Sequence, residues 1–155
     1  MANTAGVASS FKSEILLGKH QLGSVTLTSR TSLTAPTTDT LKAALYNTSA
    51  SISAATTAYT ATGEASGTGY TAGGITVTNA TAPSTSGTTG IWTPSASLVY
   101  TTVSIGPVDC VLLYNSTQGN AAIEVCTFTA QTPVAATLTL TMPTNDASNA
   151  LLRIA

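Results

Sequence analysis

The sequence predicts an all-β protein, an antiparallel β-sandwich or jelly-roll-like fold with one short N-terminal helix. Several short runs alternate apolar and polar residues, and turn-forming residues separate them. Helical and strand patterns do not alternate along the chain, as they would in a parallel sheet. The 155 residues are 43% hydrophobic and only 7% charged, which excludes a disordered chain. We therefore expect a single domain over 1–155, with residues 1–8, which are small and polar, as a flexible N-terminal arm.

The N-terminal region contains the one predicted helix. Ser10 can cap a helix over Phe11–Leu17, and Gly18 can end it. The alternation in Val25–Thr28 predicts a strand, and residues 36–39 predict a turn.

The segment Leu41–Tyr46 fits two structures. Leu41 and Leu45 share a face at helical spacing, whereas Leu41, Ala43 and Leu45 share a face at strand spacing. The β-favouring neighbours lead us to expect a strand. Residues 48–58, mostly Ser, Thr and Ala, predict a loop with at most one turn of helix.

A glycine-rich segment over residues 59–74 is the most distinctive stretch of the chain. Glycine accepts positive φ angles and close backbone approach, so its repetition here predicts a shaped loop that no helix or regular strand would follow. Alternation begins immediately afterwards and predicts a strand over Ile75–Thr78. Residues 83–90, rich in Ser, Thr and Gly, predict another loop.

Alternation predicts the remaining strands. They are Ile91–Thr93, Leu98–Ile105, Val108–Tyr114, Ala121–Ala130, Thr137–Met142 and Leu151–Ile154. Leu138, Leu140 and Met142 are expected to point to the core. Seven to nine short strands in all are expected.

The two cysteines fall on the predicted hairpin of Val108–Tyr114 and Ala121–Ala130. If it turns about Gln118, Cys110 opposes Cys126 on the face away from the core, a face that a neighbouring subunit could cover. We nevertheless expect free thiols, because no signal peptide or membrane span is visible and the default is synthesis in the reducing cytosol.

The sequence argues against catalysis. His20 is the one histidine, expected to be solvated or capping, and no nucleophile motif accompanies it. Asp109 and Glu124 could approach each other across the hairpin, but solvated edge positions are the simpler interpretation. The spacing of Gly67, Gly69 and Gly73 misses the dinucleotide fingerprint, and a strand follows instead of a helix. We expect no enzyme activity, cofactor or metal. A net charge of −1 favours neither nucleic acid nor membrane as a partner.

The glycine motif GEASGTGYTAGG resembles that of a family of tailed-bacteriophage virion structural proteins, the small head decoration or cement type. The order SSFKSEILLG, TDTLKAALYN, DCVLLYNST and LTLTMP…ALLRIA extends the resemblance over most of the chain. The resemblance implies a β-fold that stabilises the phage head by binding the major capsid protein and sister copies. It implies synthesis in the host cytoplasm and a place on the head surface. Candidate assembly contacts are Gly63, Glu64, Gly67, Gly69, Tyr70, Gly73 and Gly74.

Two alternative functions remain open. One is a tail, collar or fibre-base component of a virion. The other is a carbohydrate-binding or adhesion module, which would need an exposed aromatic platform. Its possible members are Tyr59, Tyr70, Trp92 and Tyr100.

Overall fold

The computed structural model describes residues 3–8, 10–11, 15, 20, 22–23, 37–78 and 81–154. These residues form an all-β structure in which every strand pairing is antiparallel. The strands are β1 (Gly6–Val7), β2 (Leu41–Asn47), β3 (Gly67–Thr68), β4 (Ile75–Thr76), β5 (Ser84–Ser86), β6 (Thr89–Trp92), β7 (Leu98–Ile105), β8 (Val108–Asn115), β9 (Ala121–Gln131), β10 (Ala136–Leu140) and β11 (Leu152–Ile154).

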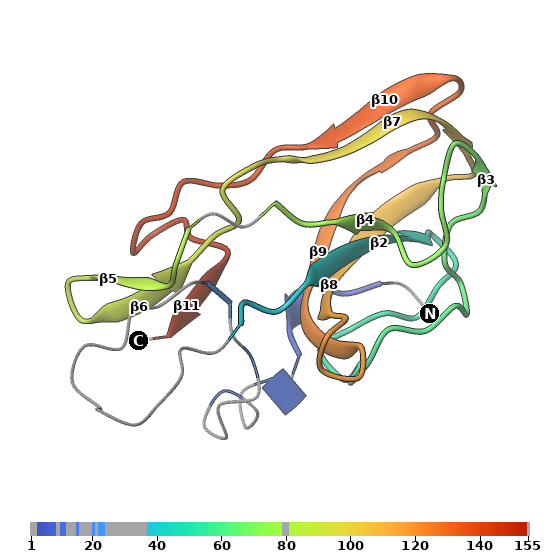
Figure 1. Cartoon of the computed structure of the whole chain (residues 1–155). Coiled ribbons are helices and arrows are strands. Elements are labelled where there is room, and N and C mark those ends of the chain that lie inside the picture. Colours follow the sequence, from blue (N-terminus) through green and yellow to red (C-terminus); the bar gives the residue numbers. More distant parts are fainter. Residues whose placement is uncertain are drawn as a thin grey trace.

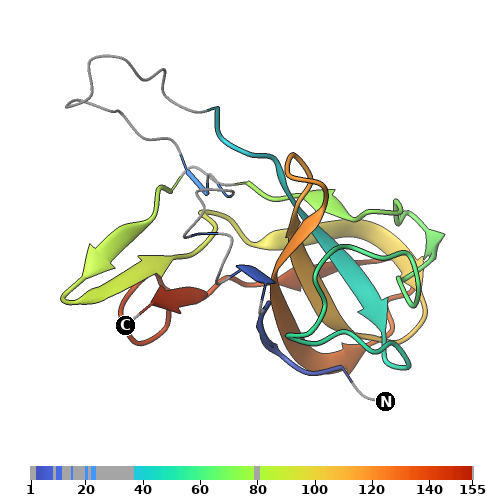
Figure 2. The same ribbon diagram turned by 90° about the horizontal axis from the view of Figure 1, so that it is seen from below.

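The strands form three sheets. The main sheet has the order β1-β9-β8-β2-β4, and a second sheet, β10-β7-β3, lies against it (Figure 1). The hydroxyl of Tyr100 on β7 donates to the carbonyl of Ala43 on β2 across this junction, at 3.0 Å. The third sheet, β11-β6-β5, projects from one end of the body (Figure 2). The prediction of antiparallel sheets is confirmed, while a jelly-roll topology remains a prediction.

The centre of the main sheet is covered on both faces. Neighbouring residues on a strand point to opposite faces, yet Ala44 and Leu45 on β2 are both fully buried, as are Leu112 and Leu113 on β8. The side of β8 that carries Cys110 is therefore covered by the chain itself, and no neighbouring subunit is required to cover it.

The strands in which apolar and polar residues alternate most strongly were predicted with the most accurate bounds. β7 has the bounds predicted for it, and β2, β8 and β9 each extend one residue beyond theirs. β4, β10 and β11 are shorter than predicted. Of the three side chains expected to point to the core, Leu138 is buried, while Leu140 and Met142 are half-buried. The described residues already contain more strands than the seven to nine expected. The strand Val25–Thr28 lies outside the described residues. The helix over Phe11–Leu17 is not seen, because most of its residues also lie outside them.

The predicted flexible arm is wrong for residues 3–8. Gly6 and Val7 pair with Val125 and Glu124 of β9. The Asn3 amide donates to Asp109 Oδ1 at 2.6 Å, and its own oxygen accepts the Ile52 N–H at 2.9 Å. Small side chains do not make this segment flexible here; they permit close packing on the sheet edge.

The predicted loop over residues 83–90 is also wrong, because it contains a hairpin. Ser84 pairs with Ile91 and Ser86 with Thr89, and Gly87 has the positive φ angle of 61° at the turn. Serine and threonine fit both loops and strands, so composition alone did not distinguish the two.

The register of the central hairpin differs from the prediction by one residue. Tyr114 pairs with Ala122 as predicted, but Leu113 pairs with Glu124, because Ile123 lies in a bulge between them. Beyond this bulge Cys110 opposes Thr127, and Val111 opposes Cys126. The two cysteines are therefore not direct partners, and both thiols are free.

The structure predicts two inert thiols. Burial raises the pKa of the Cys110 thiol to about 12, with Asp109 adding to the effect, and burial also raises the pKa of Cys126. Because the thiolate is the reactive form, the native protein at pH 8 should react with a thiol reagent far more slowly than the urea-unfolded protein, which should titrate two thiols. An intact mass two hydrogens lower, or fast native labelling of both residues, would contradict this prediction.

Candidate functional site

The glycine-rich segment follows the outer edge of β2. The carbonyl of Gly63 accepts the N–H of Asn47 at 2.9 Å, and the N–H of Ala65 donates to the Leu45 carbonyl at 2.8 Å. Farther along, Ile75 on β4 pairs with Ala43. The segment thereby satisfies backbone groups that the edge of β2 would otherwise expose.

Two glycines show why the motif needs this residue type. Gly67 (φ 151°) pairs with Ile105, and a Cβ atom there would collide with the carbonyl oxygen of Ser104 on β7. Gly74 (φ 70°) lies so close to β2 that a Cβ atom would collide with the Ala43 carbonyl. The close backbone approach is therefore made within the chain. The prediction that no regular strand occurs in the segment is wrong for β3, which is two residues long.

Glu64 holds the two ends of the segment together. Its carboxylate accepts hydrogen bonds from the Tyr59 hydroxyl at 2.6 Å, the Tyr70 hydroxyl at 2.8 Å and the N–H of Gly73 at 2.7 Å. The residue is only 9% exposed. The Tyr70 oxygen also accepts the N–H of Leu45 at 3.0 Å, which ties the group to β2. We call these residues, Tyr59, Glu64, Tyr70 and Gly73, the Glu64 clasp.

The tyrosines of the clasp are held in their neutral form. Burial, followed by the hydrogen bond to Glu64, raises the pKa of Tyr59 to about 12 and raises the pKa of Tyr70 as well. Both hydroxyls therefore donate to Glu64, and neither is poised to accept a proton from a substrate near neutral pH.

The predicted contact residues lie in three places along the segment. Glu64, Tyr70 and Gly73 meet in the clasp, next to Gly74, and the last two are buried. Gly67 and Gly69 lie exposed near β7, and Gly63 approaches Ala50 at the start of the segment. Between the fixed points, β3 and the residues that follow it, 67–72 in all, form an exposed stretch in which only Tyr70 points inward, and we call this stretch the exposed turn.

Sequence reasoning missed that Glu64 and Tyr59 act together. The available signal was one carboxylate in a nearly uncharged segment, with a tyrosine on either side. A lone acid in an otherwise uncharged segment requires donors nearby if it is buried, and the two tyrosines could have been identified as those donors.

A second polar network fixes the β8–β9 turn. The fully buried Asn115 donates to Asp39 Oδ2 at 2.6 Å and bonds His20 Nδ1 at 3.1 Å. Its oxygen accepts the N–H groups of Thr117 and Gln118, both at 3.1 Å. His20 was predicted to be solvated or capping, but it packs on the Phe11 ring with centroids 4.8 Å apart. No nucleophile takes part in these bonds, and the network positions a turn.

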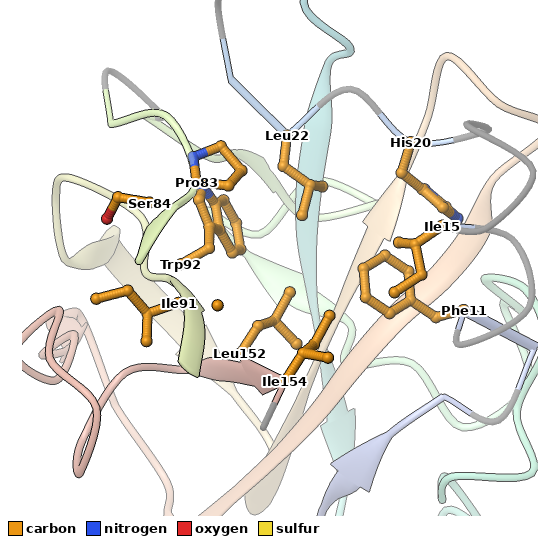
Figure 3. Close-up of a pocket in the computed structure, with 11 residues that line it drawn as sticks. Phe11, Ile15, His20, Leu22, Pro83, Ser84, Ile91, Trp92, Leu152 and Ile154 are labelled. Atoms are coloured by element: carbon orange, nitrogen blue, oxygen red, sulfur yellow. The ribbon is translucent and has the colours of Figure 1, made fainter. Parts of the chain in front are cut away.

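An apolar pocket of about 240 Å³ lies between the N-terminal segment and the third sheet. Figure 3 shows Phe11, Ile15 and His20 on one side, and Trp92 and Ile91 of β6 on the other, with the β11 side chains between them. Its described walls carry no charged side chain.

The aromatic platform required for sugar binding is not formed. Trp92 and Tyr100 are each only 2% exposed. Tyr70 stacks on Tyr100 with centroids 6.1 Å apart, and Tyr59 stacks on Tyr114 at 4.9 Å. The four aromatic residues therefore belong to the core and to the clasp.

Asp109 and Glu124 are not brought together. Asp109 accepts a hydrogen bond from Asn3, whereas Glu124 opposes Leu113, four positions away on β8. Glu124 is half-buried, and its Oε2 atom has no hydrogen-bond partner among the described residues. Burial raises the pKa of Glu124 to about 8, although Arg153 opposes the shift.

Within the described part of the chain, no three His, Cys, Asp or Glu residues are grouped so that they could hold a metal ion. No helix of the described residues is long and apolar enough to span a membrane. No protein-family model, curated protein or solved structure matches this chain.

The Glu64 clasp predicts that a substitution of similar size, Glu64→Gln, lowers the stability of the fold. Glu64→Gln exchanges one acceptor oxygen for an N–H₂ group that faces a donor, so stability should fall by about 2 kcal/mol, the order found for hydrogen bonds to charged groups. Urea unfolding at pH 7 measures this change. The matched control is Glu124→Gln, which removes no hydrogen bond from Oε2 and should not destabilise. Equal unfolding midpoints for wild type and Glu64→Gln would contradict the clasp.

Glu124 predicts a pH dependence of stability. Because its folded pKa is raised, protonation of Glu124 contributes stability that is fully present below its ordinary value of 4.5 and is lost as pH rises through about 8. Glu124→Gln mimics the neutral acid. Its stability should match wild type at pH 4 and exceed it at pH 9, by about 1–3 kcal/mol, the penalty for an unsatisfied buried group. Parallel pH profiles for the two proteins would show that Glu124 is not responsible.

Proposed function

We propose that the protein is a non-enzymatic virion subunit, a cement or decoration protein that binds major capsid protein subunits and sister copies on a phage head. The observation that carries the proposal is the exposed turn over residues 67–72, within the motif that resembles this family. The Glu64 clasp and the pairing of β3 with β7 anchor the turn on both sides. Such a turn presents backbone groups in one fixed arrangement, which lowers the entropic cost of binding.

Three polar side chains form hydrogen bonds within the chain, which supports an assembly role over catalysis. Glu64, Asp39 and Asn115 direct their hydrogen bonds to the chain's own turns and tyrosines. Two packed antiparallel sheets also agree with the sandwich expected of such a subunit. The sugar-binding alternative loses support, because its aromatic residues are used in packing.

Attachment should depend on apolar area and backbone hydrogen bonds. Eleven charged residues, five basic and six acidic, are too few for ion pairs to dominate an extended contact. Raising salt from about 0.1 M to about 1 M shortens the screening length from about 10 Å to about 3 Å. A contact of this kind should survive that change.

The proposal predicts where the protein lies and what removes it. A map of intact particles should show it on the head, with residues 67–72 against a neighbouring chain, and it should stay bound in about 1 M salt. Thr71→Arg/Ala72→Arg, which alters two exposed residues, should abolish attachment without unfolding the chain. Substituting Gly67 or Gly69 would not test this, because a Cβ atom there collides with β7.

The matched control is Thr85→Arg/Thr88→Arg, which places the same charges on the exposed β5–β6 hairpin. This variant should remain attached. Release of the wild type by salt, or equal occupancy of the turn variant and the control, would contradict the proposed mode of attachment.

A further inference from the structure

β10 is the longest edge strand of the described structure. The edges of the three sheets are formed by β1 and β4, β10 and β3, and β11 and β5, and β10 has five residues where the others have two or three. It lies along the upper margin of the molecule in Figure 1, and no described segment lies beyond it. Its outward N–H and C=O groups have no strand partner among the described residues.

The usual protections of a free edge are missing from β10. Monomeric proteins blunt such edges with charged residues, proline or a bulge in the edge strand. Residues 125–145 contain no charged side chain, and β10 itself contains no proline. The register irregularity in this pair lies on β7, because two steps on β10, from Ala136 to Leu138, match three steps on β7, from Val103 to Tyr100.

Apolar surface surrounds the free edge on both faces of its sheet. On the outer face Val99, which pairs with Thr139, is 44% exposed. On the inner face, Leu140 and Met142 are only half-buried, and with Phe128 they line a cavity of about 300 Å³ between the sheets. An added strand would cover part of this surface, a gain beyond its backbone hydrogen bonds.

We propose that β10 pairs antiparallel with β10 of a second copy of this chain about a two-fold axis. Such a contact is self-complementary, because each copy offers the same edge to the other. It requires facing side chains that do not repel one another, and the uncharged Thr and Leu alternation of Ala136–Leu140 meets that requirement. The pairing joins two three-stranded sheets into one continuous sheet. This inference rests on the proposed function, in which sister copies bind one another, and it identifies the surface through which they meet.

Sedimentation of the purified protein, away from any particle, tests the pairing. The wild type should be a dimer. Thr137→Lys/Thr139→Lys places two exposed lysines on β10, so that like charges face each other across the axis. Dimerisation should weaken by roughly a hundredfold or more, since facing like charges cost several factors of ten in affinity. The matched control, Ser84→Lys/Ser86→Lys on the edge strand β5, should remain a dimer.

Amide hydrogen exchange of the wild type gives a second readout that needs no variant. Protection of residues 136–140 should increase with protein concentration, while protection of β5 should not. A wild type still monomeric at about 1 mM, or a dimer that the β10 lysines leave intact, would overturn the inference. Failure of particle attachment would leave this result unchanged, because attachment is tested on the turn over residues 67–72.

Discussion

One buried carboxylate organises the most distinctive part of this protein. Removing an ionised carboxylate from water is costly unless hydrogen bonds replace the lost solvent. Glu64 meets this requirement with neutral donors of the described chain, because two tyrosine hydroxyls and the backbone N–H of Gly73 donate to it. The donors come from positions before and after Glu64 in the sequence, so satisfying the charge closes the segment on itself. The glycines then allow the closed segment to approach β2 and β7 more closely than any side chain would permit.

Two parts of the chain cover the edges of the main sheet. On the β2 side of the main sheet, the segment provides partners for the backbone groups of Leu45 and Asn47. On the β9 side, the N-terminal strand β1 does the same for Val125. Among the described residues, the second sheet has no corresponding cover along β10. Parts of the chain thus cover both outer strands of the main sheet, whereas β10, the longest edge strand among the described residues, is left uncovered.

Sequence reasoning succeeded where side-chain alternation is strong and failed where packing decides. β7 was predicted to the residue, because buried and more exposed residues alternate along it on either side of one irregularity at Thr101–Thr102. The one-residue bulge at Ile123 leaves no mark on the alternation, yet it moves Cys126 away from Cys110. Residues 3–8 and residues 83–90 consist mostly of small side chains, whose composition fits loops and strands equally. For the glycine segment, the need for a special backbone path was predictable, but its cause, contact with strands of the same chain, required the fold. The proposed attachment to a phage head still depends on the sequence resemblance.

Amide hydrogen exchange at Gly73 tests the central structural claim most directly. Gly73 lies in a turn, outside every strand, and its N–H donates to Glu64 Oε1. If the clasp is closed in solution, this amide should exchange as slowly as those of the core strand β2, and Glu64→Gln should accelerate it selectively. Exchange of the wild-type Gly73 amide at the rate of the exposed neighbouring turn would show that the clasp is open and that Glu64 does not organise the segment.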